Sequence, residues 1–274
     1  MEADFTWKNA LFVFGFATLF FSLRYLLMAG SAFLLFWKFF YNRLHHRWIQ
    51  QDRIPDSQKI QHEIRYSLLT MLLFGIVAVG VYFMRTMGWT QMYENLHDYG
   101  WGYFFLSVIA LVLLHDTYFY WTHRFMHHPK IFRHVHLTHH VSTNPSPWAA
   151  FAFHPIEAVI EAGILPLAVL LFPLHHYAVI IFLFYMTLLN VLGHLGFELF
   201  PKGFLDHKIL RYHNTTTHHN MHHRYFHCNY GLYFNWWDRW MGTNHEKYKE
   251  KFDEVTHRHK EKVGVTVNDS LLIR

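Results

Sequence analysis

Hydrophobic residues lie in long runs along the first two thirds of this chain. The first run, residues 10–40, contains only Arg24 and Lys38 as charged residues. It is long enough to cross about 30 Å of hydrocarbon as a tilted helix. It is too long for the core of a signal peptide, so we expect an uncleaved span. Two further apolar runs predict spans at about residues 67–84 and 103–120.

The last two apolar runs, residues 159–171 and 177–193, are separated by Phe172-Pro173-Leu174. The first of them is short and contains Pro166, so it predicts a re-entrant hairpin or a full crossing. The pattern as a whole predicts an all-α integral membrane protein with about four transmembrane helices, one pair of which is the candidate hairpin. We expect a helical cap outside the membrane.

The loops between the predicted spans differ in their content of basic residues. The loop over residues 41–66 carries five of them, whereas the loop over residues 85–102 carries Arg85 alone. Because basic loops stay in the cytoplasm, the first loop is predicted to be cytoplasmic. Alternation of the spans, with the hairpin returning to its starting side, then places residues after Tyr120 and the C-terminal third in the cytoplasm too. The five basic residues are Arg43, Arg47, Arg53, Lys59 and Arg65.

Composition agrees with a membrane protein and narrows its chemistry. Of the 274 residues, 52% are hydrophobic and only 16% are charged, against about 25% in soluble domains. The formal charge of +5, spread among Phe and Leu, favours a membrane surface over nucleic acid. The single cysteine, Cys228, excludes an intrachain disulfide framework and every cysteine-based zinc or iron–sulfur site. Histidine, at 26 residues, is the unusual component.

Three histidine clusters have spacings that suit metal binding. Residues at i, i+3 and i+4 share one face of a helix, so each cluster can direct two or three imidazoles at one point. One such pair alone is a weak signal, but three clusters on one side of the membrane are hard to explain without metal. Their ligands exceed what one ion can use, so we expect two ions. The clusters are His123 with His127; His136 with His139 and His140; and His219 with His222 and His223.

Further polar residues lie near these clusters. His194 ends an apolar run, where an ionisable residue is a candidate functional group, and Glu198 follows it as a carboxylate ligand or an orienting partner. Asp116 lies two helical turns before His123, either to accept a hydrogen bond from a ligand ring or to face the water interface. The remaining candidates are His154, as a ligand, an orienting group or a cap before Pro155, and His128 and His218, as orienting groups.

The motifs resemble those of a known family. Residues 116–127, DTYFYWTHRFMH, resemble the "D…YW.HR..H" block of the fatty acid hydroxylase/sterol desaturase superfamily, and the two H-x2-H-H clusters match its later histidine boxes. Residues 151–157, FAFHPIE, are similar to the "HAFHP.D" block of C-5 sterol desaturases (lathosterol oxidases). The resemblance covers about residues 100–243. The sequence departs from that subfamily at Glu157 and at Leu195.

The resemblance implies a membrane-bound, non-haem di-iron enzyme that uses O2 and electrons from a separate donor. It would hydroxylate or desaturate a C–H bond of a lipid, with no catalytic residue required beyond the metal ligands. Zinc could occupy the same cage, since imidazole discriminates weakly between the two metals. The donor would be a cytochrome b5-like protein or a ferredoxin with its reductase. The implied ligands are His123, His127, His136, His139, His140, His194, His219, His222 and His223.

The same resemblance divides the chain into N-terminal membrane helices (1–100), a catalytic domain (101–243) and a polar tail (244–274). A sterol or sterol-like lipid is the expected substrate, with fatty acyl, sphingolipid, alkylglycerol and carotenoid hydroxylation as alternatives. Apolar walls suit a water-poor channel that opens to the bilayer. The candidate channel residues are Trp121, Trp148, Phe151 and Phe153, although aromatic side chains at such positions are more often core or membrane belt.

Two other classes of protein remain as alternatives. A membrane metal transporter would carry ionisable residues along its spans, lining a path across the bilayer. A haem-binding electron carrier would need paired histidines on facing spans and no H-x2-H-H clusters. The concentration of histidines on one side of the predicted membrane favours the oxygenase.

Overall fold

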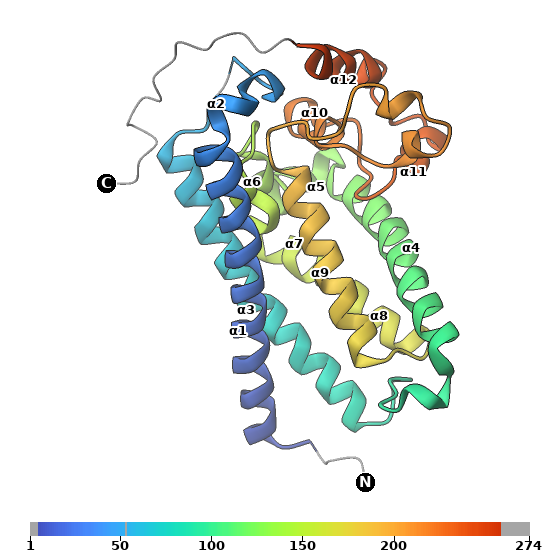
Figure 1. Cartoon of the computed structure of the whole chain (residues 1–274). Helices are drawn as coiled ribbons and strands as arrows, with labels where there is room; N and C mark the ends of the chain where they lie inside the picture. The colour runs from blue at the N-terminus through green and yellow to red at the C-terminus, as the bar shows by residue number, and fades with distance from the viewer. Residues whose placement is uncertain (1–4, 53, 259–274) are drawn as a thin grey trace.

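The computed structural model describes residues 5–52 and 54–258. Within these residues the chain forms helices, and three isolated bridges but no β-strand occur. Figure 1 shows long helices that run along one axis and shorter ones gathered at one end. The predicted all-α class is confirmed. Arg53 of the basic loop and residues 259–274 of the predicted tail lie outside the described residues.

Over residues 5–52 and 54–258, four helices are long and apolar enough to cross a membrane, as predicted. Two of them, over Ser57–Thr86 and Gly100–Met126, extend beyond the apolar runs that predicted them, because polar end turns continue these helices into the cap. Asp56, for example, accepts a 2.8 Å hydrogen bond from the Lys59 amide and so starts its helix at Ser57. The four are α1 (Trp7–Ala32) with its π-helical extension η1 (Phe33–Phe39), α3 (Ser57–Thr86), α4 (Gly100–Met126) and α9 (His176–Gly193).

The outer faces of these helices are apolar and exposed. Phe12 and Leu27 of α1, for instance, are 70% and 67% exposed. Apolar surface of this extent is too costly to leave in water and marks contact with lipid. The chain is therefore a multi-pass membrane protein.

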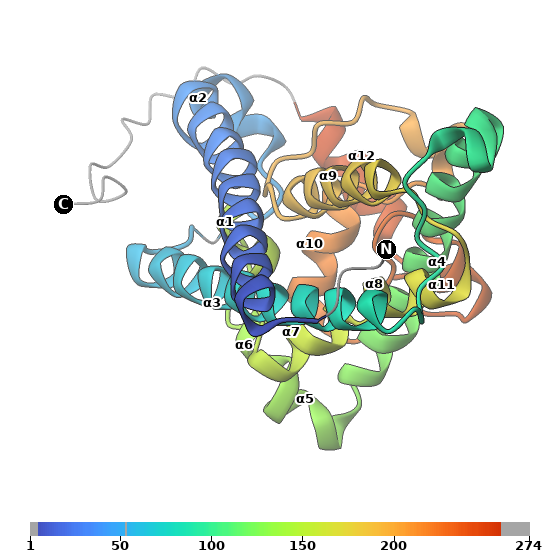
Figure 2. The ribbon, with the colours of Figure 1, turned by 90° about the horizontal axis from the view of Figure 1, so that it is seen from below.

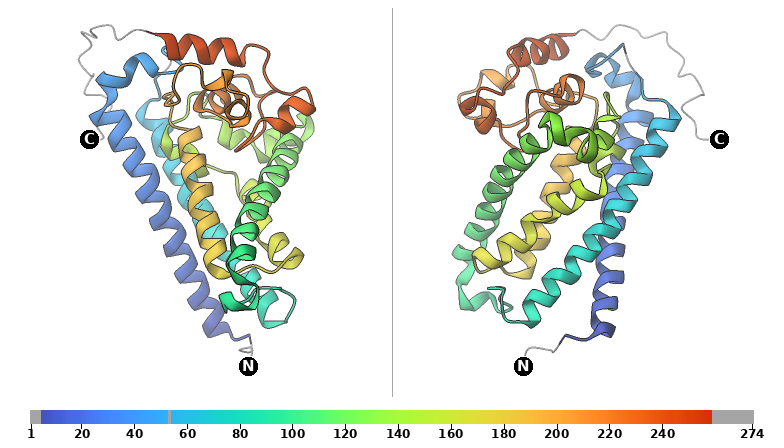
Figure 3. Two further views of the ribbon diagram at one scale, coloured as in Figure 1. Left: turned by 45° about the vertical axis from the view of Figure 1, so that its right-hand side comes forward. Right: turned by 180° about the vertical axis from the view of Figure 1, so that it is seen from behind.

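The run over residues 159–171 does not form a span of its own. It is divided between α7 (Pro155–Ala162) and α8 (Ile164–Leu171), both too short to cross a membrane. The pair leads away from the cap and α9 returns to it (Figure 3), as the re-entrant alternative predicted. At the break, a Cβ on Gly163 would lie 2.6 Å from the Tyr118 hydroxyl. Glycine thus permits α7 to approach α4 closely.

The remaining helices form the cap. It contains the basic loop and both histidine-rich segments, so all three lie at the same end of the bundle (Figure 1), in agreement with the predicted alternation of spans. Its α-helices are α2 (Tyr41–Leu44), α5 (Pro129–Val135), α6 (Leu137–His140), α10 (Thr216–Tyr225), α11 (Trp236–Trp240) and α12 (Tyr248–His257). Its 3-10 turns are η2 (His45–Arg47), η4 (Pro147–Phe151), η5 (Phe204–Asp206) and η6 (Leu210–Tyr212), and η3 (Leu96–Asp98) lies at the opposite end.

The first two spans position the segment that leads from the cap into the membrane. Tyr25 of α1 and Ser67 of α3 each donate a 2.9 Å hydrogen bond to the main-chain carbonyl of Trp148. The fully buried Glu63 of α3 accepts hydrogen bonds from the amide and the hydroxyl of Ser146. Seen from below, α1, α3, α4, α8 and α9 lie around the axis on which α10 is visible (Figure 2). The membrane helices therefore surround the axis below α10 and contact the cap from that side.

Candidate metal centre

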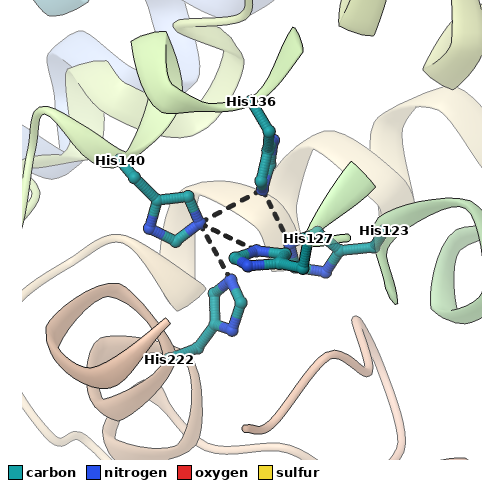
Figure 4. A group of neighbouring side chains, drawn as sticks. All are labelled: His123, His127, His136, His140 and His222. Atoms are coloured by element: carbon teal, nitrogen blue, oxygen red, sulfur yellow. Dashed lines mark hydrogen bonds between the residues drawn. The ribbon is translucent and has the colours of Figure 1, made fainter. Parts of the chain in front are cut away.

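The structure brings all nine histidines implied as ligands into two groups. The five-histidine group is His123, His127, His136, His140 and His222, and the four-histidine group is His139, His194, His219 and His223. Within each group the candidate ligand nitrogens lie within 4.8 Å of one another. In Figure 4 the rings of the five-histidine group converge from different segments on one point. Each group could hold one ion.

Each H-x2-H-H cluster is divided between the two groups, which differs from the expectation that a cluster converges on one point. In α6, His139 belongs to the four-histidine group and His140 to the other; in α10, His223 and His222 are divided in the same way. Successive residues of a helix point about 100° apart, so adjacent histidines cannot face the same ion. The two histidine pairs thereby link the groups.

The ring orientations of the four-histidine group leave unprotonated nitrogens facing each other. The Nδ1 atoms of His194 and His223 lie 2.7 Å and 3.0 Å from the carbonyl oxygens of Asn190 and Ser142. A carbonyl only accepts, so each Nδ1 carries the proton, and a neutral ring then has a lone pair on Nε2. The two Nε2 atoms are 3.2 Å apart. Two lone pairs at this distance repel unless a cation lies between them.

The five-histidine group has the same arrangement. His123 and His222 donate from Nδ1 to the carbonyls of Tyr230 and Cys228, at 2.8 Å and 2.7 Å. Their Nε2 atoms turn inward, and neighbouring Nε2 atoms of the group are 3.0–3.1 Å apart. Nitrogens bound at 2.0–2.1 Å to a shared ion would also be about 3 Å apart. The residues present therefore fit a metal ion in each group.

The protonation state of these histidines suits metal binding. Burial, and secondly the neighbouring imidazoles, lower the pKa of His140, His222 and His223 well below the ordinary value for histidine. These rings are therefore neutral at physiological pH, which is the form that ligates metal. Imidazole suits zinc, iron, copper and nickel.

Glu157 is a site residue that the sequence analysis did not assign. Its Oε1 lies 2.7 Å from Nδ1 of His136, and its side chain is 1% exposed. A carboxylate that accepts from a ligand histidine fixes the tautomer and makes the ring a stronger ligand. The available signal was an acidic residue two positions after Pro155, at the start of an apolar run, where a buried charge indicates function.

Asp116 does not accept from a ligand histidine, so that prediction is wrong. Its carboxylate accepts hydrogen bonds from the amides of Tyr233 and Phe234, at 2.8 Å and 3.2 Å, and from the Trp236 indole at 2.7 Å. Seven residues of helix separate it from His123 by about 10 Å, which is beyond the reach of a carboxylate. Asp116 instead fixes the loop before α11 to α4.

Glu198 and His218 lie near the site but belong to neither group. Glu198 accepts 2.9 Å and 2.6 Å hydrogen bonds from the amide and hydroxyl of Thr217. It therefore holds the N-terminus of α10, the helix that supplies three candidate ligands. The ring of His218 lies 3.5 Å from the Asp238 carboxylate. Both were predicted to contact the metal or a ligand ring. In the described part of the chain, neither side chain contacts a candidate ligand ring.

His154 and His128 are helix caps. Nδ1 of His154 accepts from the Ile156 amide at the start of α7, which confirms the capping alternative among its three predicted roles. Nδ1 of His128 accepts from the Lys130 amide at the start of α5, and the side chain is exposed. The prediction that His128 orients a ligand is therefore wrong. Both residues precede a proline, and such a position favours the extended backbone of an N-cap.

An apolar cavity lies between the spans, and residues of its wall contact a histidine of each group. We name it the lipid cavity. Its lining includes Phe119, whose ring is 4.9 Å from that of His123, and Phe153, whose ring is 5.3 Å from that of His139. Helices α1, α3, α4, α7, α8 and α9 contribute to its wall.

Two of the four predicted channel residues, Phe151 and Phe153, line the lipid cavity. Trp121 and Trp148 do not, so the prediction is wrong for them. Trp121 is 43% exposed on the outside of α4 and packs against Trp237. Trp148 packs against Tyr25 and Phe33 of the first span. Periodicity could not distinguish an aromatic residue of the cavity wall from one of the outer belt.

Comparisons with known proteins agree with this site. The family model for fatty acid hydroxylase matches residues 108–243, which include both histidine groups. The chain is 31% identical over 214 residues to Delta(7)-sterol 5(6)-desaturase ERG3B of Gibberella zeae, covering 78% of this chain and 63% of that protein. It is 30% identical over 190 residues to the lathosterol oxidase of Rattus norvegicus, covering 68% and 62%.

A third relative is the Delta(7)-sterol 5(6)-desaturase erg3C of Aspergillus fumigatus. It is 29% identical over 236 residues, which cover 79% of this chain and 72% of that protein. The matches thus span less than two thirds of the Gibberella and rat proteins. No solved structure was found to match the chain.

Proposed function

Through residues 108–243 this chain belongs to the fatty acid hydroxylase family, and from that premise we propose that it is a membrane-bound, non-haem di-iron oxygenase of lipids. It would hydroxylate or desaturate a C–H bond with O2 and electrons from a separate donor. The observation that carries the proposal is the pair of histidine groups, each with inward-facing lone pairs, at the end of an apolar cavity.

The five-histidine group would hold one iron and the four-histidine group the other. Two bound irons would supply an O2-derived oxidant strong enough to break an unactivated C–H bond. The protein would hold the rings through Glu157 and the main-chain carbonyls. Phe119 and Phe153 would keep water away from the reacting carbon, which protects a strong oxidant from side reactions. Zinc remains the alternative metal for the same ligands.

A sterol or sterol-like lipid is the proposed substrate. Two named relatives are Delta(7)-sterol 5(6)-desaturases and a third is a lathosterol oxidase, and the lipid cavity has a predominantly apolar wall. Fatty acyl, sphingolipid, alkylglycerol and carotenoid hydroxylation are the alternatives within the family. The substrate would enter from the bilayer, because the cavity lies between spans whose outer faces contact lipid.

We propose that the cap faces the cytoplasm, where the external electron donor would bind. The basic residues Arg43 and Arg47 lie in the cap, next to the end of α1, and basic loops are retained on the cytoplasmic side. A metal transporter would need candidate ligands along a path across the bilayer. All nine candidate ligands lie at one end of the bundle, which favours the oxygenase.

The test is oxidation of lipid by the iron-loaded protein in nanodiscs, given a chemical reductant and O2. Mass spectrometry of lathosterol and representative acyl lipids would detect a gain of one oxygen or a loss of two hydrogens. A variant with His136, His139 and His140 all changed to Ala is the control. Iron-dependent product that is absent from the variant supports the proposal. A folded, iron-loaded protein that oxidises none of these lipids contradicts it.

A further inference from the structure

Three polar side chains interrupt the wall of the lipid cavity: His115, Glu161 and Asn190. Asn190 has a structural partner, since its amide nitrogen donates to the carbonyl of Ala150 at 2.5 Å. Glu161 of α7 is 8% exposed. Within the described residues its carboxyl has no hydrogen bond and no ion pair, although an unsatisfied buried polar group is costly. Its exposed atoms face the cavity that it lines.

His115 of α4 presents a second polar atom to the same cavity. Its Nδ1 is 2.8 Å from the hydroxyl of Tyr233. If the phenol donates to Nδ1, the ring carries its proton on Nε2 and can donate to a ligand. Tyr233 is fully buried and lies within electrostatic range of Glu161. The two side chains thus belong to one polar region of an otherwise apolar wall.

The absence of a positive charge near Glu161, among the described residues, determines which class of ligand the polar region can bind. No lysine or arginine is among the residues that line the cavity. A carboxylate without a cation in an apolar wall carries a large desolvation cost, so the protonated acid is favoured. A protonated carboxyl both donates and accepts a hydrogen bond. An alcohol is the uncharged group that matches it, whereas the carboxylate of a free fatty acid would lack a cation.

We propose that Glu161 and His115 bind a hydroxyl group of a sterol-like lipid and so determine which lipids the enzyme accepts. The inference rests on the proposed function, which assigns the cavity to the substrate. His115 precedes His123 by eight residues, a rise of about 12 Å along the helix, and Glu161 lies one turn, about 6 Å, from Glu157. The hydroxyl group is therefore bound roughly 10 Å from the metal centre, and this spacing selects the carbon that reacts.

Binding of two sterols to the metal-loaded protein in nanodiscs tests the proposal independently of activity. The probes are dehydroergosterol, a fluorescent 3-hydroxy sterol that accepts energy from tryptophan, and its 3-deoxy analogue. We expect Glu161→Leu to weaken binding of the hydroxy sterol about 5- to 10-fold, which is the change in affinity expected from the loss of one hydrogen bond. The affinity for the deoxy sterol should not change. Glu161→Gln, which can still donate and accept, should keep most of the affinity.

Leu165→Ala is the matched control, because Leu165 lines the same cavity without a polar group and its truncation should weaken both sterols equally. Metal content and melting temperature show whether each variant is folded. The proposal is overturned if the wild type binds neither sterol, if it binds both equally, or if Glu161→Leu weakens both alike. Failure to oxidise any lipid would contradict the proposed function. The sterol-binding measurement would still show whether Glu161 and His115 bind the hydroxyl group.

Discussion

The two histidine groups differ in the partners that hold their rings. In the five-histidine group, His136 is paired with the Glu157 carboxyl, whereas the other oriented rings donate to main-chain carbonyls. In the four-histidine group, His194 and His223 donate to carbonyls alone. A carboxylate raises the basicity of its ligand ring. The comparison teaches that two sites built from similar motifs need not bind metal equally, and we expect the five-histidine group to bind more tightly.

The groups also share two structural supports. The pairs His139–His140 and His222–His223 each give one ring to each group, so α6 and α10 belong to both sites. A change that displaces either helix should therefore affect two ions, whereas loss of a single ring, or of the partner of one ring, should affect one.

The largest effect on metal content and activity is expected when one histidine of the pairs His139–His140 or His222–His223 is removed. His140→Ala should abolish the ion of the five-histidine group and His223→Ala that of the four-histidine group, since each loses a central ligand. Each variant should keep about one ion per chain and lose activity by at least about 1,000-fold, the order expected when a reaction loses its main source of transition-state stabilisation. Metal analysis of the purified variants measures this. Loss of both ions from either variant would show that the groups do not bind independently.

Glu157→Gln should have a smaller effect, confined to the metal affinity of the five-histidine group. Loss of the carboxylate partner of His136 should weaken metal binding by the five-histidine group about 10- to 100-fold and leave the other group unchanged. Competition with a chelator, followed by metal analysis, measures both affinities. Glu161→Gln is the matched control on the same helix, because Glu161 contacts no candidate ligand. Equal weakening of both groups by Glu157→Gln would refute the assigned difference between them.

Glu198→Ala tests the shared support. Glu198 accepts two hydrogen bonds from Thr217 at the start of α10, and loss of such a cap costs about 1–2 kcal/mol of stability. We expect a lower melting temperature and weaker metal binding by both groups to a similar degree. A change confined to one group would mean that α10 does not couple them.

The smallest effect is expected from the histidine caps. His154→Ala removes the acceptor for the Ile156 amide at the start of α7 and should lower stability by about 0.5–1 kcal/mol. His154→Asn, which keeps a capping acceptor, should retain the wild-type melting temperature. Both variants should hold the full complement of metal. Loss of an ion from His154→Ala would assign this residue to the metal centre after all.

Hydropathy was sufficient to predict the four membrane helices and the hairpin of α7 to α9. Their ends were not predictable from hydropathy, because polar turns continue α3 and α4 into the cap. The last turn of α4 is such an extension, and it carries His123. Local spacing likewise predicted which histidines gather. It did not predict how each cluster divides between the two groups, which depends on where the other histidines lie around α6 and α10.

The orienting groups were the least predictable part of the site. Five ligand rings donate to main-chain carbonyls or to Glu157, and a main-chain carbonyl has no signature in the sequence. Asp116 and Glu198 were reasonable candidates by helical spacing, but each is used to fix a neighbouring segment. Proximity along a helix identified polar residues near the site and not the atoms that they contact.

Anomalous X-ray scattering at the iron edge, from crystals of the iron-loaded protein, tests the central claim most directly. We predict two separate peaks, one among the Nε2 atoms of the five-histidine group and one among those of the four-histidine group. The peak of the four-histidine group should weaken first when crystals are soaked in chelator. A single peak, or peaks outside these two groups, would contradict the two-metal centre.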